Sequence, residues 1–312
     1  MPLATPVWVT VTPATVQTVT RTPFEPQDPP TPTPSPLPPT PTPVPTATRP
    51  PAPTAAPISS SGSISILLLG SDQRPGRGDF RTDVFLLLII RPDSSLALVS
   101  FPRDLYVYMP ALGKKERINA AYEFGGFSLV SQTLQYNFGF RPDYFVLTNF
   151  SGFRSIVDSL GGIDVQVGKE LTDARSGYPD GYTVPVGIIH MDGETALWYV
   201  RSRKTTSDFD RLRRAQEVII AIGQKLLTLQ GLTRIPELYQ TYKASVVTNL
   251  TLEDVLTLAP RLQGVNPNQV ERYAITPPLV TNWNDPVDGR FLLLPNIPGI
   301  QSLLRQAFGL NP

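Results

Sequence analysis

Residues 64–72 read ISILLLGSD, an aliphatic run that stops at a glycine, a serine and an aspartate. Similar runs follow at residues 84–90 (VFLLLII) and 96–101 (LALVSF). Nearly continuous apolar runs of this length are typical of strands that are covered on both faces of a sheet. The last two runs are separated by a turn-like segment at residues 92–94, so they are predicted to form a hairpin.

The rest of the globular region alternates strand-like with helix-like stretches. Further apolar strands are predicted at residues 143–149, 163–167, 270–275 and 291–294. Helical patterns occupy residues 127–136, 150–160, 194–200 and 252–261. Because strands alternate with helices while one neighbouring pair forms a hairpin, the predicted fold class is α/β, a three-layer α/β/α sandwich around a mixed central sheet.

A long helix is predicted after residue 207. Ser207 and Asp210 have the spacing of a capping box, and apolar residues then recur every three or four positions. Arg211 and Arg214 would share a neighbouring face near its start, where backbone amides and the helix dipole favour an anion. The alternative is that these arginines form a solvated face.

The composition excludes several classes of site. With 27 basic and 26 acidic side chains among 312 residues, the net charge of +1 gives no reason to expect nucleic-acid binding. The absence of cysteine excludes disulfides, thiolate nucleophiles and cysteine-bound metals. His190 is the only histidine, which excludes multi-histidine metal sites. It stands in a turn-like approach to a helix, where a structural or surface role is expected.

Residues 1–61 differ in kind from the rest of the chain. Threonine and proline alternate there without helical or strand periodicity. This composition predicts a disordered, extended stalk or linker, which could span on the order of 150 Å, or else featureless disorder. Residues 62–312 are predicted to form one globular catalytic domain. The sequence shows neither a long apolar stretch nor a signal peptide, so we expect a membrane anchor, if any, in a segment outside it.

Arginine and aspartate recur together where apolar runs end. They do so at residues 70–72 with 81–83, at residues 101–104, and at residues 201–203 with 208–214. Guanidinium groups match phosphate oxygens two at a time, and neighbouring carboxylates repel each other unless a cation lies between them. One such pair would be a surface contact worth under about 1 kcal/mol. Its recurrence predicts a site for a polyphosphate and a divalent metal.

Nine blocks of this chain together resemble the LytR-CpsA-Psr family, in the order in which that family has them. They are residues 66–72, 81–83, 100–104, 117–122, 124–126, 150–153, 157–163, 191–203 and 208–211. The resemblance covers about residues 62–230. It implies an α/β/α sandwich in which a lipid carrier lies in an apolar tunnel between the sheet and the helices.

The resemblance also implies an activity. It is that of an extracytoplasmic enzyme of the cell envelope, at the outer face of the membrane, with an anchor that is not visible in this chain. Such an enzyme transfers a glycopolymer with its phosphate from a polyprenyl-pyrophosphate carrier to a wall acceptor, typically peptidoglycan. The product is a phosphodiester link.

Roles for individual residues follow from the same resemblance. Asp72 and Asp83 would hold Mg²⁺, or Mn²⁺, on the pyrophosphate. Asp208 would assist them or act as a base, and Arg103 would complete the catalytic set. The residues expected to bind the phosphates are Arg81, Arg103, Arg201, Arg203 and Arg211.

One position departs from the family pattern. The family usually has Arg-Gln-Gln where this chain has Arg214, Ala215 and Gln216. Ala215 lies one turn after Arg211, so a polar contact is expected to be lost on the face of the site. Gln216 points about 140° away and could compensate only if the helix were rotated or unwound.

Two other functions remain open at this stage. Water could replace the sugar hydroxyl, which would make the protein a pyrophosphatase acting on the same carrier. Alternatively, a non-catalytic envelope module could bind a polyanionic polymer through its arginines.

Overall fold

The computed structural model describes residues 55–58, 62–74, 76, 80–228, 239–240, 242–243, 245–262, 266 and 269–311. The chain divides into two compact units, residues 1–48 and 49–312, and all described residues belong to the second. Most of the predicted stalk therefore lies outside the described residues, and the predicted domain boundary stays a prediction. Residues 55–58 pack on the domain: Ile58 is buried, and its amide donates to the carbonyl of Gly139 at 2.7 Å.

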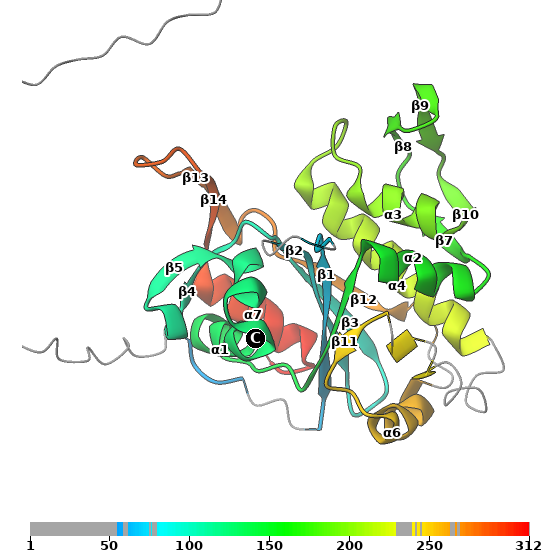
Figure 1. The fold of residues 1–312 in the computed structure, drawn as a ribbon. Helices are drawn as coiled ribbons and strands as arrows, with labels where there is room; N and C mark the ends of the chain where they lie inside the picture. Colours follow the sequence, from blue (N-terminus) through cyan, green and yellow to red (C-terminus); the bar gives the residue numbers. More distant parts are fainter. Residues whose placement is uncertain are drawn as a thin grey trace, which may run out of the picture. The chain divides into compact units, whose positions relative to one another are not determined.

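A six-stranded sheet with strand order β11-β6-β1-β2-β3-β12 occupies the centre of the domain (Figure 1). Its strands are β11 (Val247–Thr248), β6 (Tyr144–Asn149), β1 (Ile64–Ser71), β2 (Thr82–Ile90), β3 (Leu96–Phe101) and β12 (Glu271–Ala274). The pairs β1–β6 and β3–β12 are parallel and the other pairs are antiparallel. The mixed sheet and the predicted β2–β3 hairpin are confirmed.

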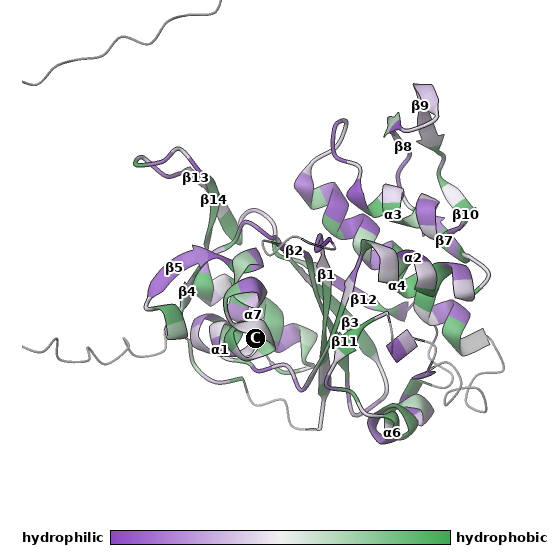
Figure 2. Ribbon diagram, viewed as in Figure 1, coloured by the Kyte–Doolittle hydropathy of each residue, from purple (hydrophilic) through white to green (hydrophobic). Residues whose placement is uncertain are grey.

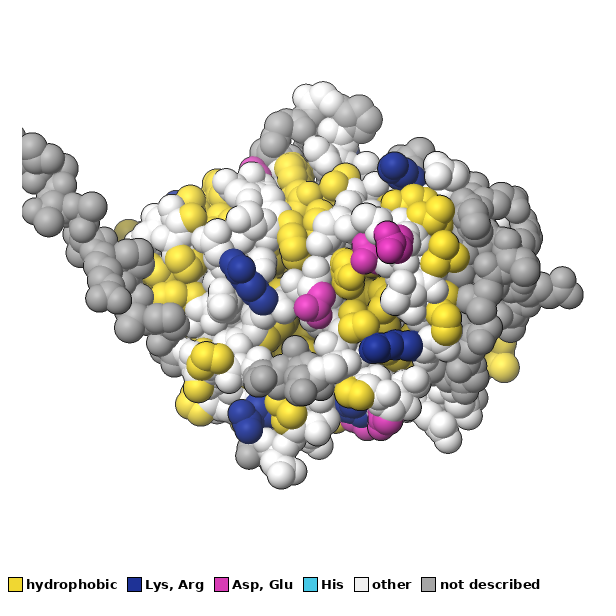
Figure 3. Space-filling view, turned by 90° about the horizontal axis from the view of Figure 1, so that it is seen from below, with side chains coloured by type: hydrophobic (Ala, Val, Ile, Leu, Met, Phe, Trp, Pro, Cys, Tyr) yellow, Lys and Arg dark blue, Asp and Glu magenta, His cyan; other side chains and the backbone are white. Residues whose placement is uncertain are grey.

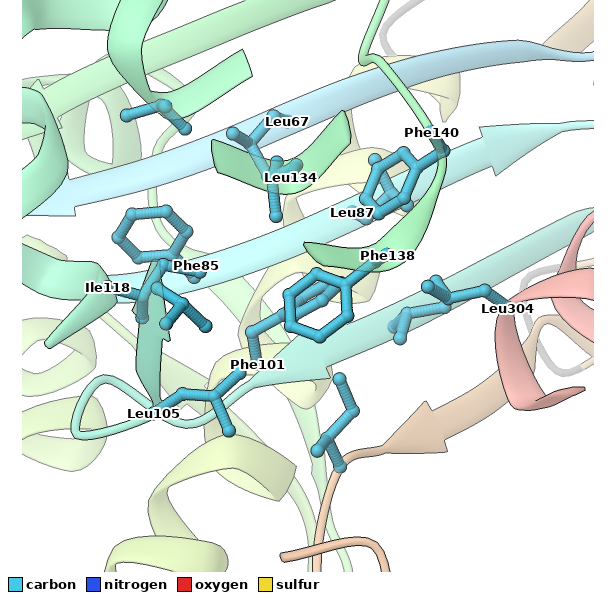
Figure 4. Close-up of a cluster of buried hydrophobic side chains, with 14 of the residues drawn as sticks. Leu67, Phe85, Leu87, Phe101, Leu105, Ile118, Leu134, Phe138, Phe140 and Leu304 are labelled. Atoms are coloured by element: carbon cyan, nitrogen blue, oxygen red, sulfur yellow. The ribbon is translucent and has the colours of Figure 1, made fainter. Parts of the chain in front are cut away.

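Both faces of this sheet are covered, as the apolar runs predicted. Leu67 and Leu69 of β1 belong to the core shared with helices α1 (Ala121–Phe138) and α7 (Ile297–Ala307). Figure 4 shows part of this core, with side chains from strands and from both helices converging. The alternate residues of β1 pack with Leu258 on the opposite face, where α6 (Leu252–Leu262) lies. The three-layer sandwich is thereby confirmed.

A second core lies beside the sheet. It joins α2 (Phe150–Ser159), α3 (Gly193–Arg201) and α4 (Asp208–Thr228) to the two-stranded sheet of β7 (Ile163–Val167) and β10 (Gly187–Met191). The strand at residues 163–167 was predicted correctly, but the expectation that both its faces are covered was wrong. Its residues alternate between buried and exposed, because only one face packs on α4.

Three hairpins, the strands β10 and β11 and one helix were not predicted, although the strand predicted at residues 291–294 is confirmed as β14. The hairpins are β4 (Tyr106–Met109) with β5 (Lys114–Arg117), β8 (Leu171–Arg175) with β9 (Tyr178–Val184), and β13 (Val280–Asn284) with β14 (Phe291–Pro295). Figure 2 shows that β5 is hydrophilic, unlike the hydrophobic strands of the central sheet. The helix is α7. Short 3-10 turns cover Pro110–Leu112 and Ile118–Ala120.

His190 lies on β10 and not in the turn expected for it. Its side chain is exposed, and Nδ1 lies 2.8 Å from Oδ1 of Asp164, so it occupies a surface position as expected.

Charged side chains are scattered between hydrophobic and neutral ones among the described residues seen from below in Figure 3. Within the described ranges, no helix has the length and apolarity that a membrane span requires.

Candidate active site

A β-bulge places Asp83 at the end of the sheet where β1, β3 and β6 finish. Gly70 pairs with Val84 and Ser71 pairs with Thr82, so Asp83 is the extra residue between them. A bulge redirects the side chain of its extra residue and is common beside functional sites. Because β2 is antiparallel to β1 and β3, the start of β2 meets the loops that follow both neighbours.

Arg103 follows β3 and contacts three carboxylates. Its Nη1 donates to Oδ1 of Asp83 at 3.1 Å. Its Nε lies 3.4 Å from Oδ2 of Asp104 and 3.7 Å from Oδ2 of Asp208. Burial lowers the pKa of Arg103, but the charges of Asp83, Asp104 and Asp208 outweigh burial and raise it overall. This guanidinium therefore stays charged.

The start of α4 brings Asp208 to Arg103. Ser207 caps the helix: its hydroxyl accepts from the amide of Asp210 at 3.0 Å and contacts the Asp210 carboxylate at 3.2 Å, as the spacing predicted. Asp208 also pairs with Arg203, with 3.7 Å between Oδ1 and Nε. One carboxylate thus joins arginines from two different loops.

Arg211 completes a set that we call the arginine–aspartate cluster: Asp83, Arg103, Arg203, Asp208 and Arg211. The side chain of Arg211 is only 5% exposed. Burial lowers its pKa and the charge of Arg103 lowers it further, although Asp208 and Asp83 oppose this shift. Within the described part of the chain, no hydrogen bond or close ion pair of its guanidinium is found, and its nitrogens are not among the fully enclosed side-chain atoms that lack a partner.

Arg211 lines a pocket of 240 Å³ together with Arg103 and Asp208. A buried cation without a partner is costly, whereas the same cation facing a bound anion is stabilised. The pocket is therefore suited to an anion with several acceptor oxygens, such as a phosphate or pyrophosphate.

Arg214 does not belong to this pocket, which corrects the prediction that it shares an anion-binding face with Arg211. It is completely buried, and its Nη2 donates to the carbonyl of Ser202 at 2.6 Å and to Oγ1 of Thr206 at 2.9 Å. The same guanidinium also donates to the carbonyls of Tyr199 and Asp210. It thereby ties the 202–206 loop to α4.

Asp72 and Arg81 pair through their backbones at the same end of the sheet. The amide of Asp72 donates to the carbonyl of Arg81 at 3.0 Å, and the amide of Arg81 donates to Oδ1 of Asp72 at 2.6 Å. The Arg81 guanidinium turns to α1, where it pairs with Glu123 at 2.8 Å and lies 6.0 Å from the ring centre of Phe124.

Arg201 ends α3 and is exposed. Its guanidinium carbon lies 4.0 Å from the ring centre of Phe150, which follows β6. The structure therefore joins Asp83, Arg103, Arg203, Asp208 and Arg211 in one cluster. It places Asp72, Arg81 and Arg201 around the same end of the sheet with partners of their own.

Asp72 and Asp83, the two residues predicted to hold a metal, each have a carboxylate oxygen without a hydrogen-bond partner among the described residues. Among described residues, each uses only Oδ1 in a hydrogen bond, Asp72 to the Arg81 amide and Asp83 to Arg103. No group of three or more acidic or histidine side chains forms a ready cage in the described ranges. Mg²⁺ commonly binds through one or two carboxylates together with phosphate oxygens and waters, so this donor set fits that ion.

Ala215 and Gln216 behave as their positions on the helix predicted. Ala215 is buried and adds no polar group to the site. Gln216 donates to Oγ of Ser100 at 2.8 Å and to the carbonyl of Tyr273 at 2.7 Å, so it joins α4 to the sheet. It therefore does not compensate for the missing glutamine.

Several pocket residues were missed by the sequence analysis. Asn282, Phe291 and Leu293 of the β13–β14 hairpin also line the pocket. Asp104 is part of the arginine–aspartate pattern at residues 101–104, without a predicted role of its own, and it contacts Arg103. The hairpin carries no charge pattern that could have connected it with the site.

The fold is an α/β/α sandwich with an arginine-lined pocket at one end of its sheet. Residues 44–306 match the LytR_cpsA_psr family, and the chain belongs to that family.

Similar proteins include the polyisoprenyl-teichoic acid–peptidoglycan teichoic acid transferase TagU of Bacillus anthracis. The two chains are 33% identical over 204 residues, which is 64% of this chain and 65% of the relative. The alignment thus spans less than two thirds of the length of each protein.

Two solved structures are similar to this fold. TagV of B. subtilis has a TM-score of 0.67 and 25% identity, over 80% of this chain and 98% of that one. TagT bound to LIIa-WTA has a TM-score of 0.62 and 26% identity, over 80% of this chain and 92% of that one.

Proposed function

We propose that this protein transfers a glycopolymer, together with its phosphate, from a polyprenyl-pyrophosphate carrier to a cell-wall acceptor, namely peptidoglycan. It would act in the cell envelope at the outer face of the membrane. Family membership and the names of TagU and of the TagT complex support this reaction class. The observation that carries the proposal is the buried side chain of Arg211, which lines a pocket beside Arg103 and Asp208 without a hydrogen bond or close ion pair among described residues.

The cluster supplies what phosphoryl transfer requires. In the proposed reaction, an acceptor hydroxyl oxygen bonds to the phosphorus that carries the glycopolymer, and the bond from that phosphorus to the lipid phosphate oxygen breaks. Polyprenyl phosphate leaves, and the hydroxyl proton passes to the carboxylate of Asp208. Arg103 and Arg211 neutralise charge on the phosphate oxygens, with Arg203 at the rim, because catalysis of this kind depends on positioning and charge stabilisation.

A divalent ion is the proposed cofactor. Asp72 and Asp83 would hold Mg²⁺, or Mn²⁺, through the carboxylate oxygens that lack partners in the described chain. The ion would neutralise pyrophosphate charge and improve the lipid phosphate as a leaving group. Arg81 and Arg201, at the same end of the sheet, would bind outer phosphate oxygens after leaving Glu123 and Phe150.

A separate apolar pocket is a candidate site for part of the lipid carrier. It has a volume of 140 Å³ and lies between α4 and one face of the sheet, where Leu88, Leu98 and Ile219 line it. Among the described residues that line it, Gln224 has the only polar side chain. It shares no lining residue with the pocket of the cluster.

Product analysis tests the proposal. The full chain would be incubated with Mg²⁺, a polyprenyl-pyrophosphate-linked glycan and peptidoglycan fragments. We expect release of polyprenyl phosphate and a glycan attached through a phosphodiester. Free glycan phosphate formed without the acceptor would identify a pyrophosphatase instead.

The same assay distinguishes catalysis from binding. Asp72→Ala and Asp83→Ala should reduce transfer by about 100-fold or more, because metal and charge stabilisation are lost. Asp164→Ala, a change at an exposed carboxylate beside His190, serves as the control. Unchanged attachment in both site variants would show that these carboxylates take no part in transfer. Binding of the glycan by the wild type without any attachment would instead indicate a module that only binds polymer.

A further inference from the structure

The β13–β14 hairpin presents one particular face to the pocket. Asn282 pairs with Leu293, and Asn284 pairs with Phe291. Residues opposite each other in an antiparallel pair share a face, and alternate residues of a strand return to it. These four side chains therefore lie on one face, and three of them line the pocket: Asn282, Phe291 and Leu293.

The other face holds the hairpin on the domain. Leu292 is completely buried, and the ring of Trp283 stacks on Tyr106 with 6.1 Å between ring centres. On the pocket face, Leu293 is buried in the core as well, so Asn282 and Phe291 are the exposed side chains that this face offers to a ligand in the pocket.

The backbone of the hairpin is joined to the phosphate-binding side of the pocket. Nη2 of Arg117 donates to the carbonyl of Phe291 at 2.7 Å, and the amide of Leu293 donates to the carbonyl of Asp104 at 2.9 Å. Asp104 also contacts Arg103. The hairpin wall is therefore held at a fixed position relative to the arginines.

The lining residues of the pocket differ in charge. One side carries Arg103 and Arg211, whereas the hairpin side is uncharged. The Phe291 side chain is 43% exposed, and the exposed amide of Asn282 has no hydrogen-bond partner among the residues described. A pyranose ring has C–H groups on its faces and polar groups at its edge, which match an aromatic ring and an amide respectively.

The pocket also has a suitable size. Its 240 Å³ is below the roughly 300–1,000 Å³ of sites for drug-sized ligands, which favours one sugar ring beside a phosphate. We infer that Asn282 and Phe291 bind the pyranose ring next to the reacting phosphate and so contribute to glycan specificity. This rests on the proposed function. The ring belongs either to the donor glycopolymer or to the acceptor glycan.

The test compares ligands with and without a sugar. Geranylgeranyl pyrophosphate and its N-acetylglucosamine-bearing counterpart would be titrated into the full chain with Mg²⁺, and KM would be measured for soluble peptidoglycan fragments. The variants are Asn282→Ala, Phe291→Ala and Phe291→Trp. The control is Val287→Ala at the tip of the same hairpin, where the side chain is 92% exposed.

A donor sugar predicts that both alanine variants weaken the sugar-bearing ligand about tenfold, while the sugarless ligand is unaffected and Phe291→Trp retains affinity. An acceptor sugar predicts unchanged donor affinities and a KM for peptidoglycan about tenfold higher at unchanged kcat. If the affinity for the sugar-bearing donor and the KM for peptidoglycan both stay within twofold of the wild type, the inference is wrong and the proposed function stands. If the wild-type chain fails to bind the sugarless pyrophosphate, the proposed function is itself contradicted.

Discussion

Arg103 and Arg211 line the same pocket but differ in their partners. Arg103 contacts three carboxylates, whereas Arg211 is buried without a close partner in the described chain. A guanidinium that is already paired mainly orders the site. A desolvated guanidinium without a close partner can bind an incoming anion directly. The free-energy cost of removing water from it is already part of the folding free energy.

This difference predicts an unusual result for Arg211→Met. We expect transfer to fall about 100-fold or more, because one fixed donor to the phosphate is lost. Thermal stability should stay constant or rise, because a desolvated charge is removed whose cost Asp208 and Asp83 offset only in part. The control is Arg154→Met, a change at an exposed arginine paired with Glu194. A large loss of stability with activity retained would contradict this role.

Transfer should also depend on a divalent metal held by Asp72 and Asp83. Chelation by EDTA should abolish transfer, and Mg²⁺ or Mn²⁺ should restore it, since the anionic carboxylates of Asp72 and Asp83 repel the pyrophosphate unless a cation lies between them. Transfer is measured before and after adding back the ion. Full activity in EDTA would contradict a metal at these carboxylates.

Among the elements, the 202–206 loop between α3 and α4 depends on support from both sides. Arg214 donates to Ser202 and Thr206, while the carboxylate of Asp173 on β8 accepts from the amide of Lys204 at 2.9 Å. The loop carries Arg203 to the cluster. Its position is therefore determined by a buried arginine that never meets the substrate.

Arg214→Met should destabilise the protein by about 2–4 kcal/mol, because several buried carbonyls lose a charged donor. Chemical denaturation measures this loss. Transfer at a temperature where the variant is folded should also fall, because the loop that carries Arg203 is released. A change below about 0.5 kcal/mol with full activity would show that the loop is held by other contacts.

The contrast between Arg211 and Arg214 shows which features of the site sequence patterns can predict and which they cannot. Both arginines occupy the first turns of α4, and only tertiary contacts decide that one lines a pocket and the other ties a loop. The sheet was predictable because its apolar runs encode burial directly. The β13–β14 wall was not, since its place beside Arg103 comes from long-range contacts with Asp104 and Arg117.

For the molecule as a whole, a second arginine ties the far end of the chain to the sheet. Arg91 donates to Glu271 of β12 at 2.8 and 2.7 Å and to the carbonyl of Ala307 at 3.0 Å, where α7 ends. Hydrogen bonds from Arg91 and then Tyr273 lower the pKa of Glu271 from 4.5 to about 2.

This pKa predicts how stability responds to acid. A carboxyl whose pKa is lower in the folded state stabilises the protein above its unfolded pKa, and the contribution is lost as pH falls through the folded value. The thermal midpoint of the wild type should therefore exceed that of Glu271→Gln at pH 7. The difference should shrink between about pH 4.5 and pH 2. A difference that is constant over this range would contradict the assignment.

The most direct measurement for the whole account is titration of the full chain with geranylgeranyl pyrophosphate in the presence of Mg²⁺, comparing the wild type with Arg211→Met and Arg154→Met. The account predicts binding by the wild type and the Arg154 variant and a loss of about tenfold or more for the Arg211 variant. Equal binding by all three proteins would contradict the claim that this pocket receives the pyrophosphate.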